Sequence, residues 1–215
     1  MEPHFLETPA FDLHWKRADA DTDAARIARA SAASRRREMA GAMHRAGDTR
    51  TPMKTLLIVY HTMTGGTRQM AEAAASAARE QAGVSVRLQR ADETGPDDVL
   101  AADAYLFATP ENLAAMSGLM KDFFDRCYYA ALDRVNGRPY ATMICAGSDG
   151  QNALRQIDRI ATGWRLNNVA PGLIVCTHAQ TTERILAPKT IGAEDLARCA
   201  ELGAGLAAGL ALGVF

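Results

Sequence analysis

The chain has almost no excess of charge of either sign and few aromatic residues. Among its 215 residues, 24 basic and 25 acidic side chains leave a formal net charge of −1, and aromatic residues make up 6%. A near-neutral chain lacks the basic field with which proteins attract nucleic acid, so we expect no nucleic-acid partner. The most apolar stretch, residues 202–215, is too short and too rich in glycine and alanine to cross a bilayer, so we expect no membrane span.

Cysteine pairs of the C-x-x-C type are also absent. The four cysteines, Cys127, Cys145, Cys176 and Cys199, are scattered along the chain. Because zinc ligands come in clusters, this spacing gives no indication of a zinc site. We expect reduced cysteines in the core of a cytoplasmic protein.

Residues 1–52 differ in composition from the rest of the chain. They contain three consecutive arginines, Arg35 to Arg37, and no strand-like apolar run. We expect an N-terminal extension that is docked or partly disordered, or else a misassigned start, with the working protein beginning at Met53. Residues 53–215 are long enough to form one domain with a full core.

From residue 53 onward, apolar runs of strand length alternate with helical patterns. Strands are predicted at residues 54–60, 84–90, 104–109, 138–146 and 173–177. Helices are predicted at residues 67–81, within 92–100, and at 117–131, 151–166 and 193–212. This alternation indicates an α/β fold, a doubly wound parallel sheet with helices on both faces. Ligands of such sheets bind beyond the carboxyl ends of the strands, where loops 61–67, 109–116 and 146–152 are expected to meet.

The loop after the first strand has the composition of an anion-binding turn. It reads Thr62-Met63-Thr64-Gly65-Gly66-Thr67 and leads into a helix. Backbone N–H groups at a helix start, together with threonine hydroxyls, attract an anion such as phosphate. The lysine of a P-loop and the G-x-G-x-x-G spacing of a dinucleotide fold are both absent, which argues against a triphosphate and a pyrophosphate. A plain strand-to-helix turn with threonine caps is the alternative.

A second motif follows the third predicted strand. It reads Thr109-Pro110-Glu111-Asn112-Leu113-Ala114-Ala115-Met116, and Lys121-Asp122-Phe123-Phe124-Asp125-Arg126 follows in a helix. Together with the first loop, it resembles the flavodoxin-like FMN proteins, and most closely their NAD(P)H-dependent FMN reductase and quinone oxidoreductase branch. The resemblance covers about residues 53–215. It rests on two separate motifs that occur in the right order, on the right loops, with matching spacing. It implies a flavodoxin-like sheet of five parallel strands.

The resemblance also implies which residues bind FMN. They lie on three loops: Thr62, Met63, Thr64, Gly65, Gly66 and Thr67 at the phosphate; Pro110, Glu111, Asn112, Leu113, Ala114 and Met116 along the isoalloxazine ring; and Gly147, Ser148, Asp149 and Gly150 on the other side of the ring. The chain departs from the family at Gly66, where asparagine or histidine is usual. It also departs at Leu113 and Ala114, where an aromatic residue and a glycine are frequent. No catalytic side chain is implied, because the flavin carries the chemistry.

Other polar and aromatic residues near these motifs have structural interpretations. His61 is expected to support its loop, and His178 to be a polar residue at a strand end. Lys121 is expected to be solvated. Tyr128 and Tyr129 are expected to pack against their surroundings.

The resemblance implies an FMN-dependent oxidoreductase that passes electrons from NADPH or NADH to a small acceptor, such as a quinone or free flavin. Flavodoxin electron carriers share the fold, but they are typically acidic and hold the ring between aromatic side chains. Residues 53–215 contain 15 basic and 17 acidic side chains, and loops 109–116 and 146–152 contain no Trp, Tyr or Phe, which favours the enzyme. A flavodoxin-type carrier and a non-enzymatic interaction module remain as alternatives.

Two properties of the enzyme stay undetermined by the sequence. No arginine stands out as a ligand for the extra ribose phosphate of NADPH, so the sequence does not choose between NADPH and NADH. Oligomers are common in this branch, so the resemblance implies that a homo-oligomer is possible, and it does not determine the number of subunits.

Overall fold

The computed structural model describes residues 53–215, so the expectations for residues 1–52 lie outside the described residues. The strands are β1 (Lys54–Tyr60), β2 (Val84–Arg90), β3 (Ala104–Asn112), β4 (Ala115–Met116), β5 (Pro139–Ala146), β6 (Asn167–Asn168) and β7 (Leu173–Cys176). The helices are α2 (Gly66–Arg79), α3 (Pro96–Ala101), α4 (Gly118–Ala131), α5 (Gln151–Gly163), α6 (Thr182–Leu186) and α7 (Ala193–Leu212).

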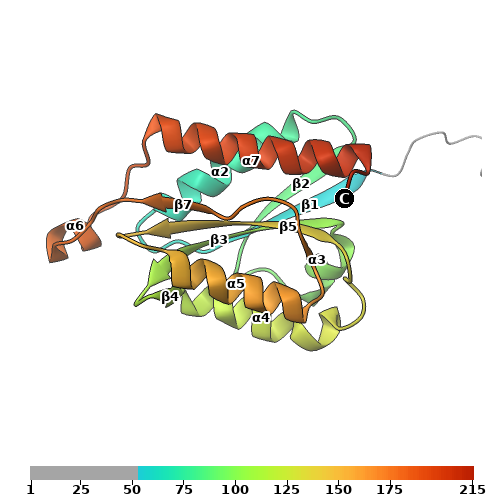
Figure 1. Ribbon diagram of the computed structural model, residues 1–215, viewed down its shortest axis with the longest axis horizontal. Helices are drawn as coiled ribbons and strands as arrows, with labels where there is room; N and C mark the ends of the chain where they lie inside the picture. Colours follow the sequence, from blue (N-terminus) through green and yellow to red (C-terminus); the bar gives the residue numbers. More distant parts are fainter. Residues whose placement is uncertain (1–52) are drawn as a thin grey trace, which may run out of the picture. The chain divides into compact units, whose positions relative to one another are not determined.

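A parallel sheet lies between two layers of helices (Figure 1). Its strands follow the order β2-β1-β3-β5, with β6 and β7 both paired to β5. Helices α2 and α7 cover one face, and α4 and α5 cover the other (Figure 1). The predicted doubly wound α/β architecture is therefore confirmed.

The sheet has seven strands rather than five, because two short strands join the five predicted ones. β6 pairs with the start of β5 and β7 with its end, so both occupy the same edge position, one after the other. Pro171 and Gly172 fall between them, and proline cannot donate to a ladder. β4 forms an antiparallel hairpin with the end of β3, which runs beyond the predicted Thr109 to Asn112.

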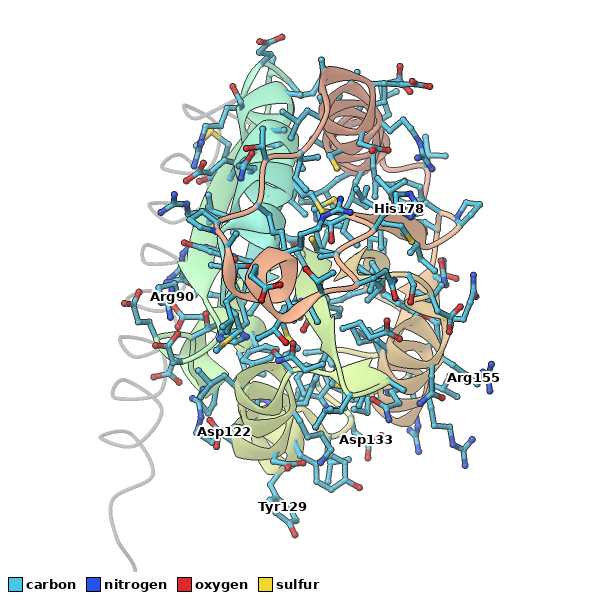
Figure 2. The ribbon with its side chains drawn as sticks, turned by 90° about the vertical axis from the view of Figure 1, so that its left-hand side faces the viewer. Arg90, Asp122, Tyr129, Asp133, Arg155 and His178 are labelled. Atoms are coloured by element: carbon cyan, nitrogen blue, oxygen red, sulfur yellow. The ribbon has the colours of Figure 1, made fainter. Side chains whose placement is uncertain are left out.

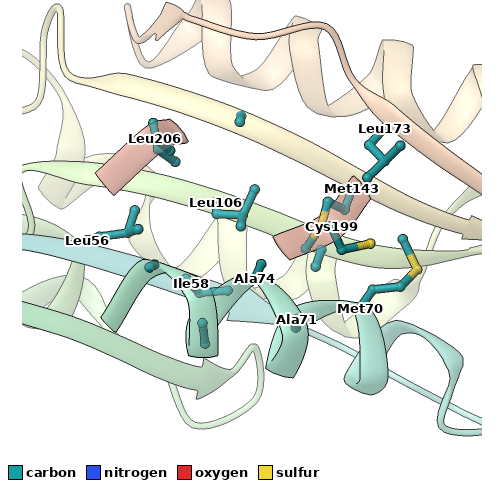
Figure 3. Close-up of a cluster of buried hydrophobic side chains, with 14 of the residues drawn as sticks. Leu56, Ile58, Met70, Ala71, Ala74, Leu106, Met143, Leu173, Cys199 and Leu206 are labelled. Atoms are coloured by element: carbon teal, nitrogen blue, oxygen red, sulfur yellow. The ribbon is translucent and has the colours of Figure 1, made fainter. Parts of the chain in front are cut away.

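Apolar side chains fill both faces of the sheet. On one face, Leu56 and Ile58 of β1 are fully buried against α2 and α7 (Figure 3). These two helices approach so closely that a Cβ atom added at Gly203 of α7 would lie 2.2 Å from the Ala74 carbonyl oxygen of α2. Small residues at this crossing therefore fix how α2, whose first turn faces the site, lies on the sheet.

The few aromatic rings gather on the opposite face. Phe107 of β3 packs edge-on against Phe124 of α4, with ring centroids 5.0 Å apart, and Trp164 contacts Phe124 in turn. Tyr129 does not join them: it is 82% exposed and projects from α4 (Figure 2), so the packing expectation is wrong for this residue. The rings of Phe107, Phe124 and Trp164 thus serve the core.

Three of the four cysteines lie in the core, as expected, and Cys176 is only half-buried. All four cysteines are free thiols, and Cys127, Cys145 and Cys199 are buried. Burial raises the pKa of the Cys145 thiol to about 11 and that of Cys199 to about 12. These thiols are therefore protonated at neutral pH.

Candidate functional site

A pocket of about 620 Å³ lies at the carboxyl ends of β1, β3 and β5. All three predicted loops contribute to its lining, as expected for a doubly wound sheet. The predicted site residues that line it are Thr62, Met63, Thr64, Gly66, Thr67, Pro110, Glu111, Asn112, Leu113, Ala114, Gly147 and Ser148. The sequence prediction therefore places most of its candidates around one cavity.

The first turn of α2 presents unused hydrogen-bond donors at one end of this pocket. Gly65 caps the helix in the left-handed conformation, with φ of 88°, and its N–H donates to the Thr62 hydroxyl oxygen over 3.0 Å. The backbone N–H groups of Gly66, Thr67 and Arg68 have no acceptor within residues 53–215. The Thr67 hydroxyl is buried beside the Cys145 thiol and has no hydrogen-bond partner of good geometry in this part of the chain. Unsatisfied donors at the positive end of a helix dipole fit an anion.

Gly66 is explained by what lies next to it. A Cβ atom at this position would lie 2.7 Å from the Cys145 sulfur of β5 and 3.3 Å from the Lys189 Cβ. The absence of the usual asparagine or histidine therefore leaves room for the thiol under the loop. Because burial keeps Cys145 protonated, the sulfur adds no negative charge beside the donors.

The β3–β4 hairpin forms the second wall of the pocket. Its turn residues Leu113 and Ala114 both have positive φ, 49° and 57°, a conformation that ordinarily favours glycine or asparagine. At its base, the buried hydroxyls of Thr109 and Ser117 lie 3.0 Å apart in a hydrogen bond. Near the tip, the Asn152 side-chain amide of α5 donates to the Ala114 carbonyl over 2.6 Å. Contacts at both ends therefore hold the strained turn in place.

Four predicted residues do not line the pocket. Gly65 serves as the helix cap described above, and Met116 is buried against the aromatic face of the sheet. Gly150 caps α5 with φ of 82°, and a Cβ atom there would lie 2.8 Å from Ile174. Asp149 is exposed. Gly150 therefore permits close packing of α5 on β7.

The pocket has a further wall that the sequence prediction missed. It comprises strand residues and the segment around α6: Cys145, Ala146, Thr177, Ala179, Ile185, Leu186 and Lys189. The short α6 projects beyond the end of β7 at the same edge of the sheet (Figure 1). Because α6 is only five residues long and mostly polar, no hydrophobic period marks it in the sequence.

Gln69 of α2 joins this wall to the first loop. Its side-chain amide nitrogen donates to the Gly65 carbonyl over 3.1 Å and to the Lys189 carbonyl over 2.6 Å. Its amide oxygen accepts the Ile191 N–H over 3.1 Å. The Lys189 N–H also donates to the Thr64 carbonyl over 2.8 Å. Gln69 is therefore a positioning residue for the first loop.

Neither histidine lines the pocket. His61 is buried at the end of β1, and burial together with the Arg90 charge lowers the pKa of its imidazole. His178 is exposed with φ of 52°, at the end of β7 (Figure 2). The placement of His61 agrees with a role in supporting its loop.

Two other kinds of feature are missing from residues 53–215. No cluster of three or more His, Cys, Asp or Glu side chains in this part of the chain could hold a metal ion. No helix there has the length and apolar character needed to span a membrane.

Comparisons with known proteins agree with this architecture. Residues 93–181 match the family of NADPH-dependent FMN reductases. A flavodoxin from Aquifex aeolicus is 44% identical over 73 residues, 34% of this chain and 40% of that protein. An NAD(P)H dehydrogenase (quinone) from Acidithiobacillus ferrooxidans is 34% identical over 94 residues, 34% of this chain and 47% of that protein. The chain spans less than half the length of these two relatives.

Solved structures extend the likeness to the fold. A flavodoxin from the domain Archaea superposes with a TM-score of 0.59 and 19% identity, covering 73% of this chain and 98% of its own. A WrbA-like flavodoxin from Agrobacterium tumefaciens superposes with a TM-score of 0.58 and 20% identity, covering 74% and 98%. The chain thus has a flavodoxin-like fold, and part of its sequence is similar to NADPH-dependent FMN reductases and to an NAD(P)H dehydrogenase (quinone).

Proposed function

We propose that this protein is an FMN-dependent oxidoreductase that passes electrons from NAD(P)H to a small acceptor such as a quinone or free flavin. The observation that carries the proposal is the set of unpartnered donors at the first turn of α2, which opens into a 620 Å³ pocket. When bound, FMN supplies two-electron transfer between donor and acceptor. The residues of the chain bind, orient and shield it.

The phosphate of FMN fits the first loop. The N–H groups of Gly66, Thr67 and Arg68 and the hydroxyls of Thr62, Thr64 and Thr67 provide donors, and Gly65 sets the helix start. A phosphate dianion here would satisfy the buried Thr67 hydroxyl, whose burial without a partner otherwise costs about 1–3 kcal/mol. Gly66 lets the backbone approach without a side chain in the way.

The isoalloxazine ring fits between the second and third loops. Residues Pro110 to Ala114 line one side of the pocket, and Gly147 and Ser148 line another. None of the lining residues is aromatic, and the apolar side chains at the mouth are the exposed Met63, Leu113, Ile185 and Leu186. An unstacked ring would leave space for a nicotinamide or a quinone, which favours the enzyme over an electron carrier.

The sequence relatives support the same choice. The matching family is described as NADPH-dependent FMN reductase, and several relatives are named NAD(P)H dehydrogenase (quinone). The four free thiols fit a reducing compartment, so we place the protein in the cytoplasm. We retain the homo-oligomer as a prediction, which light scattering of the purified protein would test.

The test is an absorbance spectrum of the purified protein under anaerobic conditions. We expect a bound-FMN spectrum that NADPH or NADH bleaches and that a benzoquinone restores. If dithionite bleaches the flavin but neither nicotinamide does, the protein is an electron carrier. A colourless protein that fails to bind FMN in a titration contradicts both functions and favours an interaction module.

A further inference from the structure

A second pocket, of about 660 Å³, adjoins the β3–β4 hairpin. It lies between the hairpin, the start of α4 and the outer face of α5, and Ala115, Met116 and Ile160 give it an apolar lining. The two pockets flank the hairpin, since Ala114 lines the first and Ala115 lines the second. Consecutive Cα atoms are about 3.8 Å apart, so only the hairpin separates the two pockets at this point.

The charged side chains that line this second pocket are all positive. Lys121, Arg155 and Arg159 line it, and no carboxylate does. Lys121 is held by both carboxylate oxygens of Asp125, each 2.7 Å away. Within residues 53–215, Arg155 and Arg159 form no ion pair and donate no hydrogen bond, and Arg155 extends from α5 into solvent (Figure 2).

No acidic side chain of α5 compensates the positive charges of these two arginines. They stand four positions apart on the same helix face, where like charges repel one another. Asp158, the single acidic residue of α5, accepts a hydrogen bond from the Tyr140 hydroxyl at 3.0 Å and does not line the pocket. Two unpaired guanidinium groups beside an apolar floor match the phosphate and the aromatic base of a nucleotide.

The polar groups of the pocket tie it to the first site. Asn152 donates to the Ala114 carbonyl, and the Met116 N–H donates to the Gln156 amide oxygen over 2.9 Å. Both amides stand on α5 between the arginines and the hairpin. A ligand on α5 would therefore lie next to the turn that lines the first pocket.

We propose that this second pocket binds the adenosine end of NADPH, with Arg155 and Arg159 holding its 2′-phosphate, while the nicotinamide enters the first pocket. The inference rests on the proposed function for the role of NADPH, but the binding itself can be tested separately. The two arginines would also distinguish the dinucleotide that has the extra phosphate, so the protein is expected to prefer NADPH to NADH.

The direct test is binding of adenosine 2′,5′-bisphosphate to the full chain, measured by titration calorimetry at low salt. The double variant Arg155→Gln/Arg159→Gln keeps most of each side-chain stem and removes both charges. The matched control is Arg79→Gln/Arg134→Gln, which changes the net charge equally at two exposed arginines outside both pockets.

We expect the double variant to bind the bisphosphate about tenfold more weakly than the wild type and the control, after discounting for solvent exposure. Adenosine 5′-monophosphate, which lacks the 2′-phosphate, should bind equally to all three. Salt should weaken bisphosphate binding to the wild type more than to the variant. Absence of binding to the wild type, or equal binding to wild type and variant, overturns the proposal.

A second readout separates this inference from the proposed function. In FMN-loaded protein the double variant should raise the KM for NADPH about tenfold, while the KM for NADH and the affinity for FMN stay as in the control. If FMN binds and NADPH is oxidised but its KM does not move, the second pocket is refuted and the oxidoreductase stands. If the bisphosphate binds through the arginines but FMN does not bind, the proposed function fails and the second pocket stands.

Discussion

The replacement Gly66→Ala probes how closely the first loop fits over β5. The added Cβ atom would lie 2.7 Å from the Cys145 sulfur, which is 0.7 Å short of the 3.4 Å at which ordinary contact begins. The contacts to Lys189 Cβ at 3.3 Å and to Ile191 Cδ1 at 3.5 Å are nearly acceptable. The sulfur therefore sets the cost of the change.

Overpacking of this kind costs about 1–3 kcal/mol, and we expect about 1–2 kcal/mol because the thiol can turn to another rotamer. The Gly66 and Thr67 N–H groups would move with the loop, and a loss of about 1.4 kcal/mol in binding corresponds to a tenfold weaker affinity for FMN. Replacing Cys145 with alanine removes the obstacle at the cost of a small cavity, about 1 kcal/mol. In the Cys145→Ala background, Gly66→Ala should then cost less than half as much.

Urea unfolding and an FMN fluorescence titration measure the two effects on wild type, both single variants and the double variant. We expect a coupling energy of about 1 kcal/mol between the two positions. Cys127→Ala is the matched control, because this thiol is also buried but lies on the opposite face of the sheet. Additive effects of Gly66→Ala and Cys145→Ala in both assays would refute the reasoning.

Four further predictions follow from the same contacts. Thr64→Glu should weaken FMN binding by about tenfold or more, because it sets a carboxylate against the phosphate. The uncharged Thr64→Gln should bind FMN much better than Thr64→Glu in a titration, and equal affinities of the two variants would contradict the loop assignment. Gln69→Leu removes the amide that orients the first loop, so it should weaken the binding of FMN more than that of riboflavin, which lacks the phosphate. An equal loss of affinity for both ligands would indicate general unfolding instead. Gly203→Ala should lower the free energy of unfolding by roughly 1–3 kcal/mol, because the added methyl group meets α2. Gly205→Ala lies on the same helix and its methyl group meets nothing within 4 Å, so it should raise the free energy of unfolding by up to about 1 kcal/mol. Urea titrations that give the two variants the same stability would contradict the close crossing of α2 and α7. Burial, and secondarily the Arg90 charge, lower the pKa of His61 in the folded state. The unfolded chain therefore binds more protons, and the free energy of unfolding should fall as the pH drops from about 7 to 5. The same loss of stability in His61→Gln would show that it does not originate from His61.

The central strands could be predicted because their apolar runs are unambiguous. Leu56 and Ile58 face one helical layer while Leu57 and Val59 face the other, so every residue in the run is buried and the run is continuous. The two-residue β6 has no such pattern. Asn167 and Asn168 are polar and pair with the start of β5, so tertiary contact alone makes them a strand.

The ends of strands were harder to predict where backbone pairing continues beyond the apolar side-chain pattern. β3 continues through Pro110, which lacks an N–H group, and still pairs with Cys145 of β5. The turn at Leu113 and Ala114 gave no turn composition in the sequence, because neither residue favours positive φ. Such a turn is formed by the contacts around it, including the hydrogen bond from Asn152.

Much of the pocket lining was predictable from loop order, but the wall around α6 was not. Gln69 and Lys189 are 120 residues apart, and no local pattern relates them. Arg155 and Arg159 likewise lie far along the chain from the hairpin and Lys121, with which they line the second pocket. The structure therefore adds residues whose roles depend on contacts between distant segments.

The glycine at position 66 and the segment after β7 form one arrangement. A side chain at position 66 would meet Cys145 and Lys189, so the space beside this loop is filled from β5 and from residue 189. Lys189 in turn is bound to the Thr64 carbonyl through its own N–H and to Gln69 through its carbonyl. The proposed phosphate site thus consists of backbone donors and threonine hydroxyls, with its side wall supplied by a segment far along the chain. Changes at residues 185–189 should therefore alter ligand binding even where they leave the first loop untouched.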